Sequence, residues 1–212
     1  MRIFVKERRI LKTKDNYINY IERMGRIANL SKDDKAFLTT LFKLKSYKKN
    51  FVIDRQGSVS KAVYYLNKGI FSMEYNKSSN IYIRDFIFAN SPALVYPSFF
   101  LNEPSRYSIR ALTDCIVWEL SKKNFEIGKK KIPNLRIIAF KITNLFHQNI
   151  EKRFESLITQ TPEERYIDLV KNHYEIINSI KLKDIASYLG INAVTLSRIR
   201  SRIAKKGFTP EN

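Results

Sequence analysis

Residues 182–203, LKDIASYLGINAVTLSRIRSRI, contain two short helical patterns that a single glycine separates. The first pattern keeps its apolar residues on one face, and Gly190 then ends it, because a left-handed backbone costs glycine least. Asn192 follows as a good N-cap for a new helix. We therefore expect a second helix with a polar, basic side and, opposite to it, an apolar side formed by Val194, Leu196, Ile199 and Ile203.

Two interpretations fit this pair of helices. In the first, it is a small helical hairpin whose arginines are only a solvated surface. In the second, the small Ala186, the turn at Gly190 and the apolar Leu196 follow a spacing that resembles the helix-turn-helix of bacterial transcription regulators, whose second helix enters the major groove of DNA. That resemblance implies a DNA-contacting set made of Asn192, Ala193, Val194, Thr195, Ser197, Arg198, Ser201 and Arg202.

The composition is that of a globular protein with a strong positive charge. The 212 residues are 44% hydrophobic and 13% aromatic, which is enough for one or two domains with real cores. The formal charge of +19 predicts a polyanionic partner, with nucleic acid ahead of a membrane surface. No apolar run approaches the roughly 20 residues of a membrane span. Since no signal-peptide pattern follows the basic N-terminus either, we expect a cytoplasmic protein without membrane contact.

The reactive residue types argue against catalysis and against a metal site. Cys115 is the only cysteine, and its neighbours Ile116 and Val117 predict a buried structural thiol. His147 and His173 lie far apart, without a cysteine at ligand spacing, so we predict no metal and no cofactor. The sequence also lacks a glycine-rich phosphate loop and a recognised nucleophile–histidine pattern. We therefore predict that the protein is not an enzyme.

A long helix is predicted upstream of the helical pair. Thr161, Pro162 and Glu164 form a capping-box signature that starts one helix. Before it, apolar residues recur at spacings of three and four from Pro133 to about residue 157, which predicts a helix of roughly 24 residues, about 36 Å long. This helix either packs along its own chain or pairs with the same helix of a second subunit as a parallel coiled coil. We favour a homodimer, with an interface made of Leu135, Ile138, Ile142, Leu145, Phe146 and Asn149.

The first half of the chain has the pattern of a β-structure. Short runs rich in β-branched and aromatic residues recur about every ten residues. They are FVI at 51, AVYYL at 62, GIFSMEY at 69, NIYIRDFIF at 80, RYSIRAL at 106 and CIVWEL at 115. Such spacing predicts an antiparallel barrel or jelly roll, in which Phe71 and Met73 face one side of a half-buried strand and Ser72 and Glu74 face the other. Residues 14–45 read as helices packed against this barrel.

A β-barrel, a long helix and a helix-turn-helix, in this order, resemble the Crp/Fnr family of transcription regulators. The resemblance is carried by VIDRQGSVSKAVYYLNKGIFSM, by PSRYSIRALTDCIVWELS and by the stretch quoted first. It implies an α+β protein in three parts: an effector-sensing, cyclic-nucleotide-binding-like barrel with flanking helices at 1–133, a dimerisation helix at 134–157 and a helix-turn-helix domain at 158–212. It also implies double-stranded DNA and RNA polymerase as partners.

The sequence departs from the family where cyclic AMP would bind. Members that bind this nucleotide carry a glycine–glutamate pair and, about ten residues later, an arginine–serine pair, which together hold the phosphate and the ribose. Here Leu94 and Val95 stand at the first pair, and Ser105 and Arg106 invert the second. We therefore expect a regulator that does not respond to cyclic AMP and whose barrel binds another, unknown effector or none. The residues expected to line an effector cavity are Tyr82, Arg84, Ser98, Arg106 and Tyr107.

The recognition helix departs from the family as well. Ala193 and Val194 stand where the cyclic-AMP-responsive members have a base-reading arginine and glutamate, whereas Arg198 coincides with a base-reading arginine. The operator sequence should therefore differ. The function predicted from the whole sequence is a homodimeric DNA-binding transcription regulator that reads a palindromic operator through residues 193–203. The alternative is a ligand-binding or protein-interaction module whose helical tail binds a partner, or binds nucleic acid without sequence preference.

Overall fold

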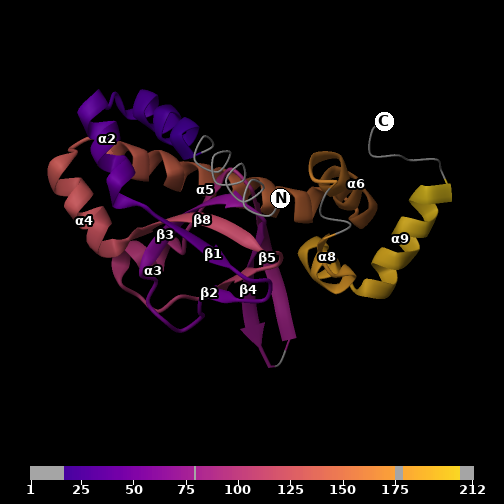
Figure 1. The fold of residues 1–212 in the computed structure, drawn as a ribbon. Coiled ribbons are helices and arrows are strands. Elements are labelled where there is room, and N and C mark those ends of the chain that lie inside the picture. Colours follow the sequence, from indigo (N-terminus) through magenta and orange to yellow (C-terminus); the bar gives the residue numbers. More distant parts are fainter. Residues whose placement is uncertain (1–16, 79, 175–178, 206–212) are drawn as a thin grey trace, which may run out of the picture.

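The structure, a computed structural model, describes residues 17–78, 80–174 and 179–205. Its first half contains two four-stranded antiparallel sheets, with strand orders β1-β8-β3-β6 and β2-β7-β4-β5 (Figure 1). The strands are β1 (Lys43–Tyr47), β2 (Val52–Asp54), β3 (Ala62–Lys68), β4 (Ile70–Lys77), β5 (Asn80–Phe88), β6 (Ser91–Ala93), β7 (Ser108–Ala111) and β8 (Cys115–Ser121). A core that includes Phe71, Ile109 and Val117 fills the space between the sheets. This arrangement confirms the expected jelly roll with flanking helices.

The strands missing from the sequence interpretation are the edge strands β1 and β6. The sequence of β1, KLKSY, is mostly exposed, and that of β6 is SPA. Lysine and proline are typical of edges that must not pair with another chain, and they remove the apolar alternation by which a strand is recognised. The expectation that helix extends to residue 45 is wrong for this reason, because β1 pairs with β8 from Lys43 to Tyr47.

Strand β4 departs from the half-buried pattern expected for it. Phe71 and Met73 face the inner core, but Ser72 and Glu74 on the other side are also buried, with 0% and 2% exposure. Figure 1 shows the reason, since the helix α8 (Leu182–Leu189) lies against β5 of the sheet that contains β4. Both sides of β4 are therefore interior over its first five residues, and its last three residues are exposed.

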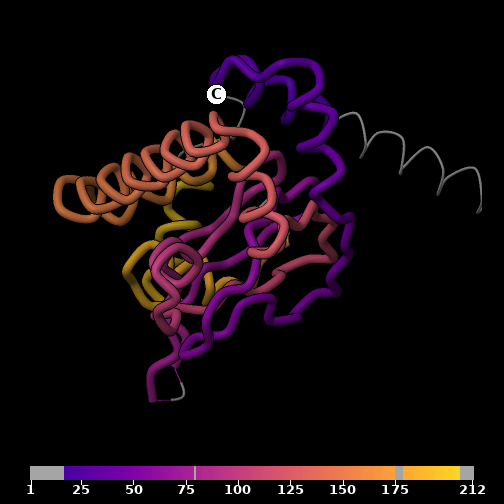
Figure 2. The backbone as a smooth tube through the Cα atoms, turned by 90° about the vertical axis from the view of Figure 1, so that its left-hand side faces the viewer, coloured from indigo at the N-terminus to yellow at the C-terminus, as the bar shows by residue number. Residues whose placement is uncertain are grey.

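Helices cover the other sheet. Residues 17–28, α2 (Lys32–Leu41), α4 (Lys122–Lys131) and the start of α5 (Leu135–Thr159) share an apolar core with that sheet. A short helix, α3 (Tyr96–Leu101), follows β6. The 25 residues of α5 agree with the long helix predicted from the sequence. Figure 2 shows α5 running along one side of the molecule, with its outer side uncovered.

The second half continues with α6 (Pro162–Asn172), α8 (Leu182–Leu189) and α9 (Ala193–Lys205). The capping box is confirmed, because the Thr161 N–H donates to Glu164 Oε2 at 2.7 Å and the Glu164 N–H donates to Thr161 Oγ1 at 3.3 Å. Gly190 adopts a φ of +72° after α8, and Asn192 Oδ1 accepts a hydrogen bond from the Thr195 N–H at 2.8 Å. Residues 182–203 therefore form the two helices, with the turn and the cap, that the sequence predicts.

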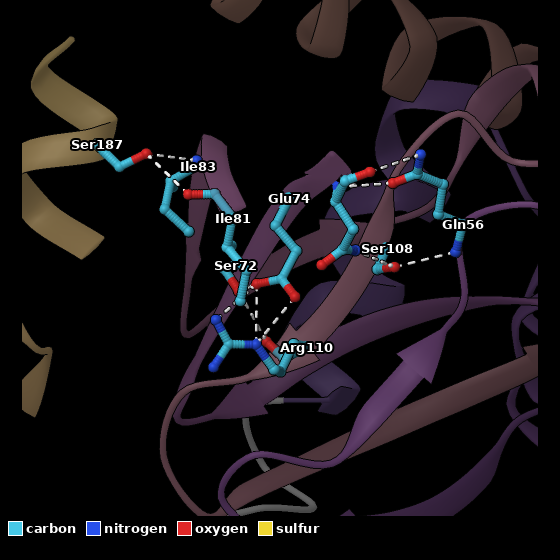
Figure 3. Close-up of polar contacts among 9 residues, drawn as sticks. Gln56, Ser72, Glu74, Ile81, Ile83, Ser108, Arg110 and Ser187 are labelled. Atoms are coloured by element: carbon cyan, nitrogen blue, oxygen red, sulfur yellow. Dashed lines mark hydrogen bonds and ion pairs between the residues drawn. The ribbon is translucent and has the colours of Figure 1, made fainter. Parts of the chain in front are cut away.

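The two halves of the chain share a second apolar core. Ile70 and Phe86 of the jelly roll pack in it with Ile185 and Leu189 of α8. At the edge of the sheet, the Ile83 N–H donates to Ser187 Oγ of α8 at 2.9 Å (Figure 3). These contacts hold α8 against the outer side of the sheet. Among the residues described, no helix combines the length and the apolar character needed to cross a bilayer.

Candidate functional site

The exposed side of α9 is the main candidate for a binding surface. Five polar side chains line a shallow open groove there: Ser197, Arg198, Ser201, Arg202 and Lys205. Their spacing along the helix places them on one face. Arg202 Nη1 also contacts Glu163 Oε2 of α6 at 2.8 Å, and the Arg202 side chain nevertheless stays 60% exposed. This face, hereafter the α9 face, offers hydroxyl and guanidinium donors to an acceptor-rich polyanion.

The buried side of α9 determines where the α9 face points. Leu196 and Ile199 pack in the second core against α8. Arg165 of α6 supports the end of α8, since its Nε and Nη2 donate to the Leu189 carbonyl at 3.1 and 3.0 Å. A carbonyl at the end of a helix otherwise lacks a partner. The sequence did not indicate this role for Arg165, because an arginine within an amphipathic helix reads as exposed.

The structure brings the eight residues expected to contact DNA to the start and the outer side of α9. Ala193 and Thr195 are half-buried, and the other six are exposed: Asn192, Val194, Ser197, Arg198, Ser201 and Arg202. Val194 is apolar and yet 62% exposed. The sequence had placed Val194 on the apolar side of the helix as well as in the contact set. Its exposure shows that the placement on the apolar side is wrong, whereas the contact with DNA stays a prediction.

A buried ion pair lies beside α8 on the covered side of the sheet. Arg110 Nε donates to the two carboxylate oxygens of Glu74 at 3.0 and 2.9 Å, and the Ser72 hydroxyl donates to Glu74 Oε2 at 3.0 Å (Figure 3). Burial alone would lower the pKa of Arg110, but the Glu74 carboxylate and Asp184 of α8 raise it above its ordinary value. Both halves of the chain therefore contribute negative charge around this one guanidinium.

The residues expected to line an effector cavity have different surroundings. The Arg84 guanidinium lies over the Tyr107 ring, 4.5 Å from its centroid, so these two are together. Ser98 is fully buried, and its Oγ accepts a hydrogen bond from the Ser60 N–H at 2.7 Å. Tyr82 is 51% exposed and Arg106 is also exposed. The structure thus does not gather the five into one lining.

Leu94 and Val95 occupy the place of the glycine–glutamate pair of cyclic-AMP-binding members. They precede α3 and are 4% and 1% exposed. Val95 belongs to the core between the sheets, and Leu94 lines a small apolar cavity of about 60 Å³. Both side chains are therefore part of the packed interior.

Helix α5 has an inner and an outer apolar side. Four of the six residues expected at a dimer interface face the core of their own chain: Leu135, Ile138, Ile142 and Phe146. The other two, Leu145 and Asn149, are exposed. Because apolar residues recur on both sides of α5, periodicity alone did not show which side the jelly roll would cover.

The outer side of α5 carries a second apolar stripe. Phe140, Ile150 and Phe154 are 63%, 44% and 61% exposed. With His147 and Leu157 they follow spacings of seven, three, four and three residues, which is the period of a coiled-coil seam. We name these five residues the outer stripe.

Cys115 is buried, as expected for a structural thiol, and its burial raises the pKa of the thiol. A buried thiol with a raised pKa is unreactive. Across the described part of the chain, no group of three or more histidine, cysteine, aspartate or glutamate side chains is placed to hold a metal ion.

Comparison with known proteins agrees with this architecture. Residues 44–127 match the cyclic nucleotide-binding domain family. FixK2 from Bradyrhizobium japonicum superposes with a TM-score of 0.66 at 18% identity, over 78% of this chain and 86% of its own. The c-di-GMP-responsive global regulator CLP of Xanthomonas campestris gives 0.65 at 11% identity, over 84% and 93%. A protein assigned to the Crp/Fnr family of transcriptional regulators, from Eubacterium rectale, gives 0.68 at 13% identity, over 84% and 86%. No curated protein sequence matches the chain.

The family match covers the jelly roll, at residues 44–127. The jelly roll, the long α5 and the helices after it extend the likeness to most of the chain, so the chain is Crp/Fnr-like in its whole fold. The family resemblance drawn from the sequence is confirmed.

Proposed function

We propose that this protein is a homodimeric, DNA-binding transcription regulator that reads a palindromic operator with α9. The observation that carries the proposal is the α9 face, where exposed hydroxyls and cations lie opposite side chains that anchor the helix to α8. In a helix-turn-helix the second helix lies in the major groove, with its N-terminal residues at the base edges. The formal charge of +19 suits a partner with a phosphate backbone.

Residues at different positions along α9 are assigned different contacts with DNA. Arg198 lies on the exposed face just beyond the first turn, and we assign it a bidentate contact to a guanine edge. Val194, exposed at the entry to the helix, suits the methyl group of a thymine. Arg202 and Lys205 lie farther from the helix start, and we assign them to phosphates. Sequence preference therefore rests mainly on the first two turns.

The outer stripe of α5 supplies the dimer contact of this proposal. It replaces the stripe expected from the sequence, because Leu135 and Ile138 are already buried in their own chain. Two α5 helices paired in parallel along this seam would hold two α9 helices for half-sites about one DNA turn apart. The chain would then work in three parts, with boundaries near residues 133 and 157, and with RNA polymerase as a further partner.

Selection of bound duplexes from a random DNA pool tests the proposal. The full chain should enrich a palindrome whose half-sites are centred about 10 base pairs apart. The matched control is the double variant Arg198→Ala/Arg202→Ala, which keeps the buried side of α9 and should enrich no sequence. Failure of the wild-type chain to enrich any sequence would contradict DNA reading, and an enriched site without twofold symmetry would contradict the dimer.

A further inference from the structure

A cavity of about 530 Å³ lies where the jelly roll, α5 and the C-terminal helices meet. Its lining comes from β5 and β6, from the second half of α5, from His173 after α6 and from Tyr188 of α8. We name it the junction cavity. Its volume is within the range of about 300 to 1,000 Å³ that small-molecule sites occupy. None of the five residues expected from the sequence to line an effector cavity belongs to it.

The charges around the junction cavity are mostly positive. Among the described residues, Arg23, Lys152 and Arg153 line it together with one carboxylate, Asp85. Burial raises the pKa of Asp85, and the nearby Arg84 and Arg153 oppose that rise. The cavity therefore offers more positive than negative charge to a bound molecule.

Arg153 is a cation of this lining with one unsatisfied hydrogen-bond donor, although its charge interacts with Asp85. Its Nε is buried and donates no hydrogen bond within the described structure, while its guanidinium lies 3.9 Å from the centroid of the Tyr188 ring. A second cavity of about 290 Å³ also borders Arg153 and Tyr188. A buried donor without an acceptor costs free energy. Arg153 borders both cavities, and a guanidinium binds the oxygens of a carboxylate or phosphate through charge-assisted hydrogen bonds.

The walls around Arg153 are aromatic. The His173 ring stacks on Phe88 with centroids 3.7 Å apart, and Phe86 contacts Tyr188 with centroids 4.8 Å apart. Such walls favour a flat or apolar body next to the acidic group of a ligand.

We propose that the junction cavity binds a small organic anion, with its carboxylate or phosphate group on Arg153 and its apolar part between Phe88 and Tyr188. The ligand would contact the jelly roll, α5 and α8 at once, so its binding would stabilise the observed placement of α8 and α9. None of the five residues of the outer stripe lines this cavity. Only the effect of the ligand on DNA rests on the proposed function. The binding itself does not.

Titration of the full chain with three probes tests the site without DNA. Phenyl phosphate and benzoate carry the two acidic groups on the same ring, and benzyl alcohol is the neutral counterpart. Calorimetry should give a dissociation constant at least tenfold lower for one or both anions than for the alcohol, and the tighter anion identifies the acidic group. Equal affinity for all three probes, or no binding of any, would overturn the proposal.

Two variants connect that binding to the cavity. Arg153→Met should lower the affinity for the anions at least tenfold. Lys123→Met, which removes an exposed positive charge from α4, should leave that affinity unchanged. If Arg153→Met does not fold, Asn149→Trp decides, because it fills the cavity from an exposed position on α5 and retains every charge. Anion binding that survives the folded variant, or that falls equally with Lys123→Met, would contradict the assignment. Because DNA is absent, failure here is distinguishable from failure of the proposed function.

Discussion

Glu74 and Arg110 form a buried ion pair whose burial the local sequence pattern does not predict. In the alternation of β4, Glu74 reads as solvent-facing, yet its side chain is only 3% exposed and it accepts two hydrogen bonds from Arg110. The cover comes from helices about a hundred residues later in the chain. Local pattern therefore predicts which residues share a face, but it does not predict whether another part of the chain covers that face.

Removal of one member of this pair should cost much more than removal of both. Arg110→Met leaves the Glu74 carboxylate buried without its partner, and we expect a loss of about 3 to 5 kcal/mol in the free energy of unfolding. The double variant Glu74→Met/Arg110→Met should recover most of that loss, and Arg106→Met, on an exposed residue nearby, is the control. Urea denaturation at pH 7 measures all four proteins. A loss below about 1 kcal/mol for Arg110→Met would show that the pair is effectively solvated.

Asp54 gives the protein a dependence of stability on pH. Burial raises its pKa from 3.8 to about 6, although the Ser60 hydroxyl, 2.9 Å away, opposes the rise. The folded state binds this proton more tightly than the unfolded state. Protonated Asp54 therefore stabilises the folded state below pH 4, and this stabilisation is lost as the pH rises through 6.

Between pH 4 and pH 7, wild type should therefore lose about 2 kcal/mol of unfolding free energy relative to Asp54→Asn, which cannot ionise. Denaturation curves of both proteins at the two pH values give this difference directly. Parallel changes in the two proteins would mean that Asp54 is not buried as described.

At the scale of elements, patterns with a strong period were predictable, and strands without one were not. The runs around β3, β4, β5 and β8, the capping box of α6 and the turn at Gly190 were all found from the sequence, because each combines a clear period with a specific end signal. The edge strands β1 and β6 lack that period. For α5 the period is clear, but apolar residues lie on two sides of the helix. Only the tertiary structure shows which of the two sides the jelly roll covers.

The outer stripe of α5 predicts how the proposed dimer can be broken. Ile150→Lys together with Phe154→Lys would place like charges along the seam, and light scattering should then give the mass of one chain, 25.0 kDa, in place of twice that mass. Gln148→Lys, exposed on the same helix outside the outer stripe, should leave the dimer intact. A dimeric mass for the double variant would place the interface elsewhere.

At the scale of the whole molecule, the surfaces of interest lie where distant segments meet. Four of the five residues of the α9 face are predicted from one short stretch of sequence, and Lys205 lies just beyond that stretch. The junction cavity was not predictable, because its lining combines β5, β6, α5 and α8, and no local pattern connects them. Val95 and Tyr107 likewise belong to the packed core between the sheets, and only the fold shows this.

Cyclic AMP and cyclic GMP should not regulate this protein through the jelly roll. Leu94 and Val95 are buried apolar residues at the place of the phosphate-binding and ribose-binding pair, and a buried phosphate without donors loses several kcal/mol of hydration. Calorimetric titration with each nucleotide should detect no binding at micromolar concentration. Micromolar binding together with a change in DNA affinity would contradict this interpretation of residues 91–107.

The most direct measurement of the central claim is the affinity of wild type and Arg198→Ala for the selected palindrome and for a shuffled duplex at one salt concentration. Wild type should prefer the palindrome. Arg198→Ala should lose about 1 to 3 kcal/mol of binding free energy for the palindrome and much less for the shuffled duplex. Arg202→Ala should weaken binding to both duplexes alike. Equal wild-type affinity for the two duplexes, or an equal loss on both for Arg198→Ala, would contradict sequence reading by the α9 face.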